Sequence, residues 1–89
     1  MKQDTEKKAI LVVSFGTSFA KTRAKTIDRM EADFAEAFPD YKVYRAWTSK
    51  KIIAKLLRRD GIRIPTVKEA VAQMPADGVT HVTVQPTHL

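Results

Sequence analysis

The chain has 89 residues, which corresponds to one domain or part of one, because domains typically contain about 100–150 residues. Its composition, with 44% hydrophobic and 29% charged residues and no cysteine, excludes a disordered or collagen-like chain, a disulfide scaffold and thiol catalysis. Sixteen lysines and arginines against ten acidic residues give a net charge of +6, which favours anionic partners: nucleic acid, a membrane surface or a polycarboxylate ligand.

We expect one domain over residues 1–89, with a polar tail over residues 1–7 and a first strand over residues 9–15 (AILVVSF). A continuous apolar run rich in β-branched residues is typical of a strand covered on both faces, as in a parallel sheet. No apolar run reaches the ~18 residues of a membrane span, and the first residues do not resemble a secretory signal. We therefore expect no membrane partner and a cytoplasmic location, although the absence of cysteine is also compatible with the periplasm.

A long helix is predicted next, because apolar side chains recur at three- and four-residue steps between Phe19 and Phe38. Pro39 ends this helix, since proline disfavours helical geometry at the residue before it. We expect the acidic side chains of the helix to form an ordinary solvated face: Asp28, Glu31, Asp33 and Glu36.

A second strand and a second helix follow. Residues 41–47 (YKVYRAW) are dense in aromatic and β-branched residues, which indicates a strand. Thr48 and Ser49 offer N-cap side chains to a helix over residues 50–59. Gly61 is predicted to end this helix, because glycine readily adopts the left-handed conformation found at helix C-termini.

The last elements are a short helix and a third strand. Thr66 and Glu69 match a capping box at the start of the helix, which Pro75 cuts short, and residues 81–85 (HVTVQ) form a strand closed by Pro86. The resulting order, β-α-β-α-α-β, predicts an α/β fold with a parallel sheet and right-handed crossovers. We expect the flavodoxin-like, three-layer arrangement with strand order 2-1-3.

Ligands bind such sheets at the carboxyl ends of the strands, beside the point where the strand order reverses. This rule selects three hydroxyl-rich loops, over residues 14–18, 47–49 and 85–89. The first loop precedes a predicted helix, whose N-terminal amide groups favour an anion such as a phosphate or a carboxylate. It matches neither a P-loop nor a dinucleotide-binding motif, so a plain turn, with Gly16 for backbone freedom and Ser18 as a cap, is the alternative.

Other residues allow a functional and a structural interpretation. His88 follows the third strand, where an imidazole can bind a divalent metal or transfer a proton, but a lone histidine is more often an ordinary surface residue. His81 is expected to be structural or exposed, and Trp47 to lie in the core or at the rim of the pocket. A basic cluster suits nucleic acid, although a solvated helix face is the favoured interpretation: Lys50, Lys51, Lys55, Arg58, Arg59 and Arg63.

Several segments carry a family resemblance in the expected order and spacing. They are AILVVSFGTS (9–18), AFPD (37–40), RAWTS (45–49), RDGI (59–62) and VQPTH (84–88). Together they resemble the anaerobic-type sirohydrochlorin cobalt chelatases, which belong to the class II chelatases. The resemblance runs from about Lys8 to Leu89, which is nearly the whole chain.

The resemblance implies the insertion of Co²⁺ (Fe²⁺ or Ni²⁺ in some relatives) into sirohydrochlorin during cobalamin biosynthesis, with no organic cofactor. Full-length members have two similar α/β halves that hold the tetrapyrrole between them, and this chain is expected to be the N-terminal half. The segment with a principal metal-binding histidine is then expected outside it. Sirohydrochlorin carries carboxylates around its ring, which suits a basic chain.

Substrate-binding roles, but no catalytic role, are implied for residues of the three loops. They are Phe15, Gly16, Thr17, Ser18, Thr48, Ser49 and His88. His88 is also the candidate metal ligand. Phe15 stands where the small relatives have a histidine, as is usual in the anaerobic type, and Pro75 interrupts a helix that is usually longer.

The third strand is predicted to leave an open edge, which favours pairing with a second copy as a homodimer or a larger assembly. Two alternatives to the chelatase stay open. One is a non-catalytic half-chelatase fragment or engineered half-domain that dimerises and at most binds a tetrapyrrole or an anion. The other, less favoured, is a basic nucleic-acid-binding α/β domain that uses the face of residues 50–63.

Overall fold

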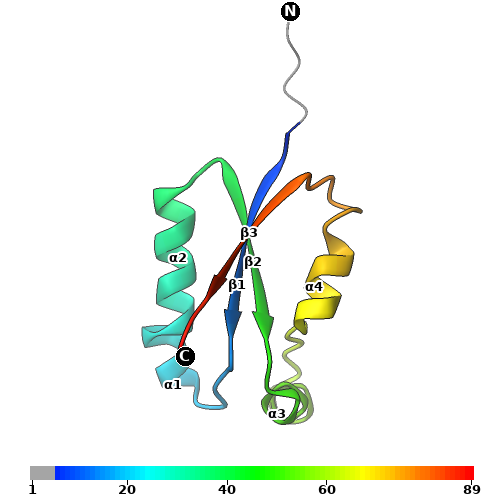
Figure 1. The fold of residues 1–89 in the computed structure, drawn as a ribbon. Helices are drawn as coiled ribbons and strands as arrows, with labels where there is room; N and C mark the ends of the chain where they lie inside the picture. Colours follow the sequence, from blue (N-terminus) through cyan, green and yellow to red (C-terminus); the bar gives the residue numbers. More distant parts are fainter. Residues whose placement is uncertain (1–5) are drawn as a thin grey trace, which may run out of the picture.

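The computed structural model describes residues 6–89 as a three-stranded parallel sheet flanked by helices (Figure 1). The elements in chain order are β1 (Lys8–Ser14), α1 (Ala20–Lys25), α2 (Ile27–Ala37), β2 (Tyr41–Trp47), α3 (Lys50–Asp60), α4 (Val67–Gln73) and β3 (His81–Pro86). The strand order is β2-β1-β3, and both pairings are parallel. The predicted α/β fold class and strand order are confirmed.

The predicted polar tail lies mostly outside the described residues, which begin at Glu6. Lys7, at the end of that range, is attached to the residues that precede β3. Its amide donates to the Thr80 hydroxyl over 2.9 Å, and the Thr80 amide donates to the Lys7 carbonyl over 2.9 Å.

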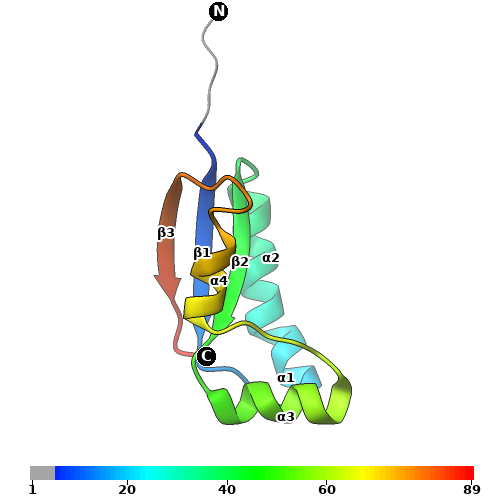
Figure 2. The ribbon, with the colours of Figure 1, turned by 90° about the vertical axis from the view of Figure 1, so that its right-hand side faces the viewer.

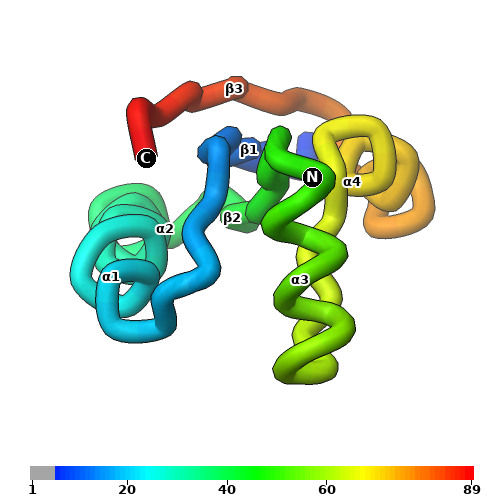
Figure 3. Tube along the Cα trace, turned by 90° about the horizontal axis from the view of Figure 1, so that it is seen from below, coloured from blue at the N-terminus to red at the C-terminus, as the bar shows by residue number. Residues whose placement is uncertain are grey.

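The core consists of two clusters, one on each face of the sheet, because β1 is covered on both sides (Figure 3). On the face of α4, buried side chains pack together from β1, β2, α4 and the C-cap residue of α4: Ala9, Leu11, Tyr44, Ala46, Ala70 and Met74. On the other face, the cluster joins α2, β2, α3 and the segment after α3: Ile27, Trp47, Leu56 and Ile64. Burial on both faces is the pattern that the continuous apolar run of β1 predicted.

The single long helix predicted between Phe19 and Phe38 is wrong, because the structure divides it at Thr26 into α1 and α2. The Thr26 hydroxyl donates to the Thr22 carbonyl over 2.6 Å. A threonine that bonds back to the preceding turn often bends a helix. Here the Thr26 backbone, at φ −117° and ψ −79°, departs from ideal helical values, while its amide still donates to the Thr22 carbonyl over 3.0 Å. The observed order is therefore β-α-α-β-α-α-β.

Two of the four acidic residues predicted to be solvated instead bind a strand. The Arg45 side chain, on β2, donates from Nε to both carboxylate oxygens of Glu31 over 2.9 and 3.0 Å, and it also donates to Asp28. Periodicity assigned these acids to the outer face of α2, whereas a long arginine on the neighbouring strand reaches them. Asp33 keeps the predicted exposure and pairs with Arg29 at 3.9 Å.

The predicted helix ends are confirmed for α3 and α4. The Ser49 hydroxyl accepts a hydrogen bond from the Ile52 amide over 3.2 Å, and Gly61 ends α3 with a left-handed φ of 68°. Thr66 and Glu69 form both hydrogen bonds of the capping box at the start of α4. These ends orient α3 across the carboxyl end of the sheet, where Figure 2 shows it.

The third strand is exposed along its whole length, in contrast to β1. All six residues of β3 are exposed, and the side chain of Val84 has an exposed fraction of 55%. Figure 2 shows β3 at the outer side of the sheet, beyond the layers formed by α2 and α4. Parallel strands are normally buried on both faces. The exposure of β3 departs from this norm and makes it the least covered strand of the sheet.

Candidate functional site

The three predicted loops meet at the carboxyl end of the sheet, which Figure 3 views from below. The Thr48 amide, after β2, donates to the Ser14 carbonyl over 2.9 Å, and the Ser49 amide donates to the Phe15 carbonyl over 3.1 Å. The Gly16 amide donates to the Leu89 carbonyl, after β3, over 3.3 Å. The structure therefore joins the first loop to both of the others through backbone hydrogen bonds.

A partly buried pair of hydroxyl groups also connects β1 to the third loop. Ser14 is almost fully buried, and its Oγ lies 2.8 Å from Oγ1 of Thr87. The Thr87 amide donates to the Val13 carbonyl over 2.9 Å, and Thr87 Oγ1 accepts from the Leu89 amide over 3.2 Å. No sequence motif marks this pair. The signal that points to it is a serine inside a strand predicted to be buried, because a buried hydroxyl requires a partner.

Gly16 occupies a position that only glycine fits. Its φ is 113°, and a Cβ atom added to it would lie 2.5 Å from Cε3 of Trp47. Trp47 is completely buried, so the added methyl group would press on a side chain of the core. The backbone of the first loop is thus pressed directly against the core, and the prediction that Trp47 lies in the core is confirmed.

The next two residues of the first loop leave backbone donors free. The Thr17 hydroxyl accepts the Phe19 amide over 3.2 Å, and the Ser18 carbonyl accepts a hydrogen bond from Arg59 over 2.7 Å. The amide groups of Thr17 and Ser18 have no hydrogen-bond partner among residues 6–89. The alternative interpretation expected Ser18 to cap the helix. The structure contradicts it, because the N-cap position of α1 is Phe19.

Two aromatic side chains flank these free amides. Phe15 has an exposed fraction of 60% and Phe19 of 70%. Large exposed aromatic side chains are unusual on a surface without a partner. The helix that follows, α1, has only six residues, so the donors here are the loop amides and not the dipole of a long helix.

The remaining predicted residues differ in whether their polar groups are free to bind a ligand. Thr48 is exposed, whereas the Ser49 hydroxyl already caps α3. His88 is exposed, and within the described range its imidazole has no hydrogen-bond or ion-pair partner. His81 lies at the opposite end of β3, where its Nδ1 is 2.9 Å from the Thr80 hydroxyl, as expected of a structural or exposed residue.

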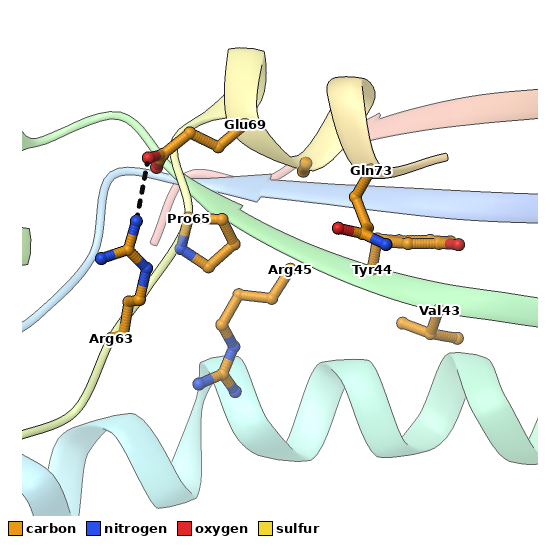
Figure 4. A pocket seen from close by; sticks show the side chains of 8 residues that line it. Val43, Tyr44, Arg45, Arg63, Pro65, Glu69 and Gln73 are labelled. Atoms are coloured by element: carbon orange, nitrogen blue, oxygen red, sulfur yellow. Dashed lines mark hydrogen bonds and ion pairs between the residues drawn. The ribbon is translucent and has the colours of Figure 1, made fainter. Parts of the chain in front are cut away.

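Hollows of the surface lie beside this end of the sheet, not at its centre. One, of about 460 Å³, follows the outer edge of β2 (Figure 4), where Arg63 and Glu69 pair at 3.4 Å. Another, of about 400 Å³, reaches the second loop at Thr48 and continues along the start of α4. Neither of these two hollows is lined by the first or third loop, and a smaller one, of about 180 Å³, reaches the third loop at Gln85.

Comparison with known proteins identifies the family. The family model described as "Cobalt chelatase (CbiK)" matches residues 8–89, and so covers all three loops. The chain belongs to this family. A curated relative, the sirohydrochlorin cobaltochelatase of Salmonella typhimurium (strain LT2), is 47% identical over 83 residues. That alignment covers 93% of this chain and 31% of the relative, so the chain spans about a third of the length of that protein.

Membership of the cobalt chelatase family confirms the resemblance that the loop and strand segments indicated. A cobalt chelatase family implies a metal substrate, and imidazole and carboxylate groups are among the side chains that bind divalent metals. The part of the chain that the structure describes contains no group of three or more such side chains that could hold a metal ion together. Nor is any helix in residues 6–89 long and apolar enough to span a membrane.

Proposed function

We propose that this chain supplies substrate-binding loops of a sirohydrochlorin cobaltochelatase, which inserts Co²⁺ into sirohydrochlorin during cobalamin biosynthesis in the cytoplasm. One observation carries the proposal: the unpartnered amides of Thr17 and Ser18 stand where the three loops of a cobalt chelatase family member converge. Backbone N–H groups bind carboxylates well, and the net charge of +6 attracts a polycarboxylate ligand. The name of the relative from Salmonella typhimurium supports the choice of sirohydrochlorin.

Each predicted site residue has a role in this proposal. The amides of Thr17 and Ser18 donate to carboxylates of the macrocycle, while Gly16 allows the loop to lie against the core. Phe15 offers an exposed ring to the apolar surface of the macrocycle. The second loop contributes the exposed hydroxyl of Thr48, and Ser49 holds that loop by capping α3.

His88 is proposed as a ligand of the incoming Co²⁺, with Fe²⁺ and Ni²⁺ as alternative metal substrates and no organic cofactor. Its imidazole is exposed and unpartnered within the described range, so it is free to bind a divalent ion. Spectroscopic metal-insertion assays with sirohydrochlorin and Co²⁺ separate a catalytic chain from the non-catalytic alternative. Turnover supports the first, and binding spectra without turnover support the second.

The carboxylate contact is tested by a matched pair of substitutions at one position. Ser18→Pro removes the free amide, whereas Ser18→Ala keeps it and removes only the hydroxyl. We expect Ser18→Pro to bind sirohydrochlorin about ten- to a hundredfold more weakly in an absorbance titration, since a hydrogen bond to a charged group contributes ~1.5–3 kcal/mol. Equal affinities of the two variants, or no binding by the unsubstituted chain, would contradict the proposal.

We also propose that the chain forms a homodimer through β3. The strand exposes Val82 and Val84, and no neighbouring strand covers its outer edge within the described residues. The free N–H and C=O groups of an edge strand pair readily with another chain. Closed symmetry would then place two β3 strands side by side across a two-fold axis.

If the chain dimerises, its sedimentation coefficient is expected to rise with protein concentration. Val84→Lys is expected to shift the equilibrium to the monomer, because it places a charge on the proposed interface. Val71→Lys on α4 is the matched control, since Val71 has a similar exposed fraction, 46% against 55% for Val84. A monomer at every concentration tested would rule the dimer out.

A further inference from the structure

The segment RDGI (59–62), one of those that carry the family resemblance, ends α3 in an unusual way. Arg59 turns back from the last turn of the helix and donates from Nη2 to the carbonyl of Ser18 over 2.7 Å. The two residues are 41 positions apart in the chain. A single guanidinium therefore connects the C-terminal end of α3 to the first loop of the candidate site.

The carboxylate of Asp60 holds this guanidinium in place. Arg59 donates from Nε to Oδ1 of Asp60 over 2.9 Å and from Nη2 to Oδ2 over 2.7 Å. These hydrogen bonds, with the positive charges of Arg59 and of Arg23 on α1, lower the pKa of Asp60, so the pair is charged at neutral pH. A bidentate pair of this kind fixes the direction of the guanidinium plane.

The hydrogen bond from Arg59 reaches the part of the first loop that has the fewest other contacts with distant segments, Thr17 and Ser18. Gly16 is fixed by its hydrogen bond to Leu89 and by its contact with Trp47. Beyond Gly16, and within residues 6–89, no other hydrogen bond joins Thr17 or Ser18 to a different segment of the chain. The free amides of the site thus lie between one firmly packed anchor and one anchor provided by Arg59.

We propose that Arg59 is a positioning residue: by holding the Ser18 carbonyl, it keeps the amides of Thr17 and Ser18 arranged to receive carboxylates. The proposal rests on the proposed function for the identity of the ligand, but not for the effect on the loop. Because Asp60 balances the charge of Arg59, the contribution is to loop geometry and not to long-range attraction of the ligand. A loop ordered before binding loses less conformational entropy when the ligand arrives.

The test compares Arg59→Ala with Arg58→Ala, which removes the same charge from an exposed neighbour in the same helix. In the ligand-free chain, we expect the ¹⁵N order parameters of Thr17 and Ser18 to fall from about 0.85 to below about 0.6 in Arg59→Ala only. We expect sirohydrochlorin affinity to fall about tenfold in the same variant, with little change in Arg58→Ala. Far-ultraviolet circular dichroism checks that both variants remain folded.

The possible results distinguish the role of Arg59 from the function of the site. Unchanged order parameters in Arg59→Ala would overturn the positioning role, even if affinity fell, because Arg59 would then contact the ligand itself. An equal loss of affinity in both variants would also overturn it, since charge alone would explain the loss. If the unsubstituted chain bound no sirohydrochlorin, the proposed function would fail, while the order parameters would still decide the role of Arg59.

Discussion

Replacing Gly16 by alanine is expected to lower the free energy of unfolding by about 2–4 kcal/mol. The left-handed φ of 113° strains any residue with a Cβ atom, which costs ~1 kcal/mol, and the added methyl group would overlap the Trp47 ring, which costs ~1–3 kcal/mol. Trp47 is completely buried and packs with Ile27, Leu56 and Ile64, so a shift of the ring would disturb the core. Urea unfolding followed by Trp47 fluorescence measures the change.

Gly61→Ala is the matched control for this prediction. Gly61 also has a positive φ, of 68°, but an added Cβ would meet no atom within 4 Å. We expect this variant to lose only ~1 kcal/mol, which is the cost of the backbone conformation without the overlap. Equal losses at Gly16 and Gly61 would show that the first loop moves away from Trp47 easily, and would weaken the view that it is firmly anchored there.

Leu56→Ala is expected to reduce the free energy of unfolding by about 2–5 kcal/mol, the range for removing a large apolar side chain from a packed core. Leu56 is fully buried and joins α3 to Trp47 and Ile27. Since α3 carries Arg59 and is capped by Ser49 of the second loop, this contact also supports the candidate site. Urea titration at constant ionic strength gives the value.

The neighbouring Leu57 provides the control, because it has the same side chain on the same helix but an exposed fraction of 48%. We expect Leu57→Ala to change stability by less than about 1 kcal/mol. Domains of this kind are stable by only ~5–15 kcal/mol, so Leu56→Val offers a milder change where Leu56→Ala does not fold. Similar losses in Leu56→Ala and Leu57→Ala would contradict the observed orientation of α3.

The elements that could be predicted from the sequence are those specified by near neighbours in the chain. The apolar run of β1, the capping box of Thr66 and Glu69, and the left-handed Gly61 each depend on residues within a few positions of one another. Parallel strand order followed from the alternation of these elements, and it brought the three loops to one edge. The same segments also carried the resemblance to the cobalt chelatases.

Most of what could not be predicted depends on residues far apart in the chain. Helical periodicity placed Asp28 and Glu31 on a solvated face, yet Arg45 on β2 reaches both. The bend at Thr26 is a local exception: the Thr26 hydroxyl donates to the Thr22 carbonyl, four residues away, and this hydrogen bond leaves no mark in the apolar pattern.

The sequence by itself therefore determined the fold class, the strand order, the loops that meet at the carboxyl end of the sheet, and the family, because local patterns and short motifs specify all of these. Only the tertiary structure decided how the first loop is held. The loop is held where Gly16 lies against Trp47 and where the guanidinium of Arg59 donates to the Ser18 carbonyl. Such contacts arise when the packing of the core brings distant residues together, and the spacing of residues along the chain does not record them.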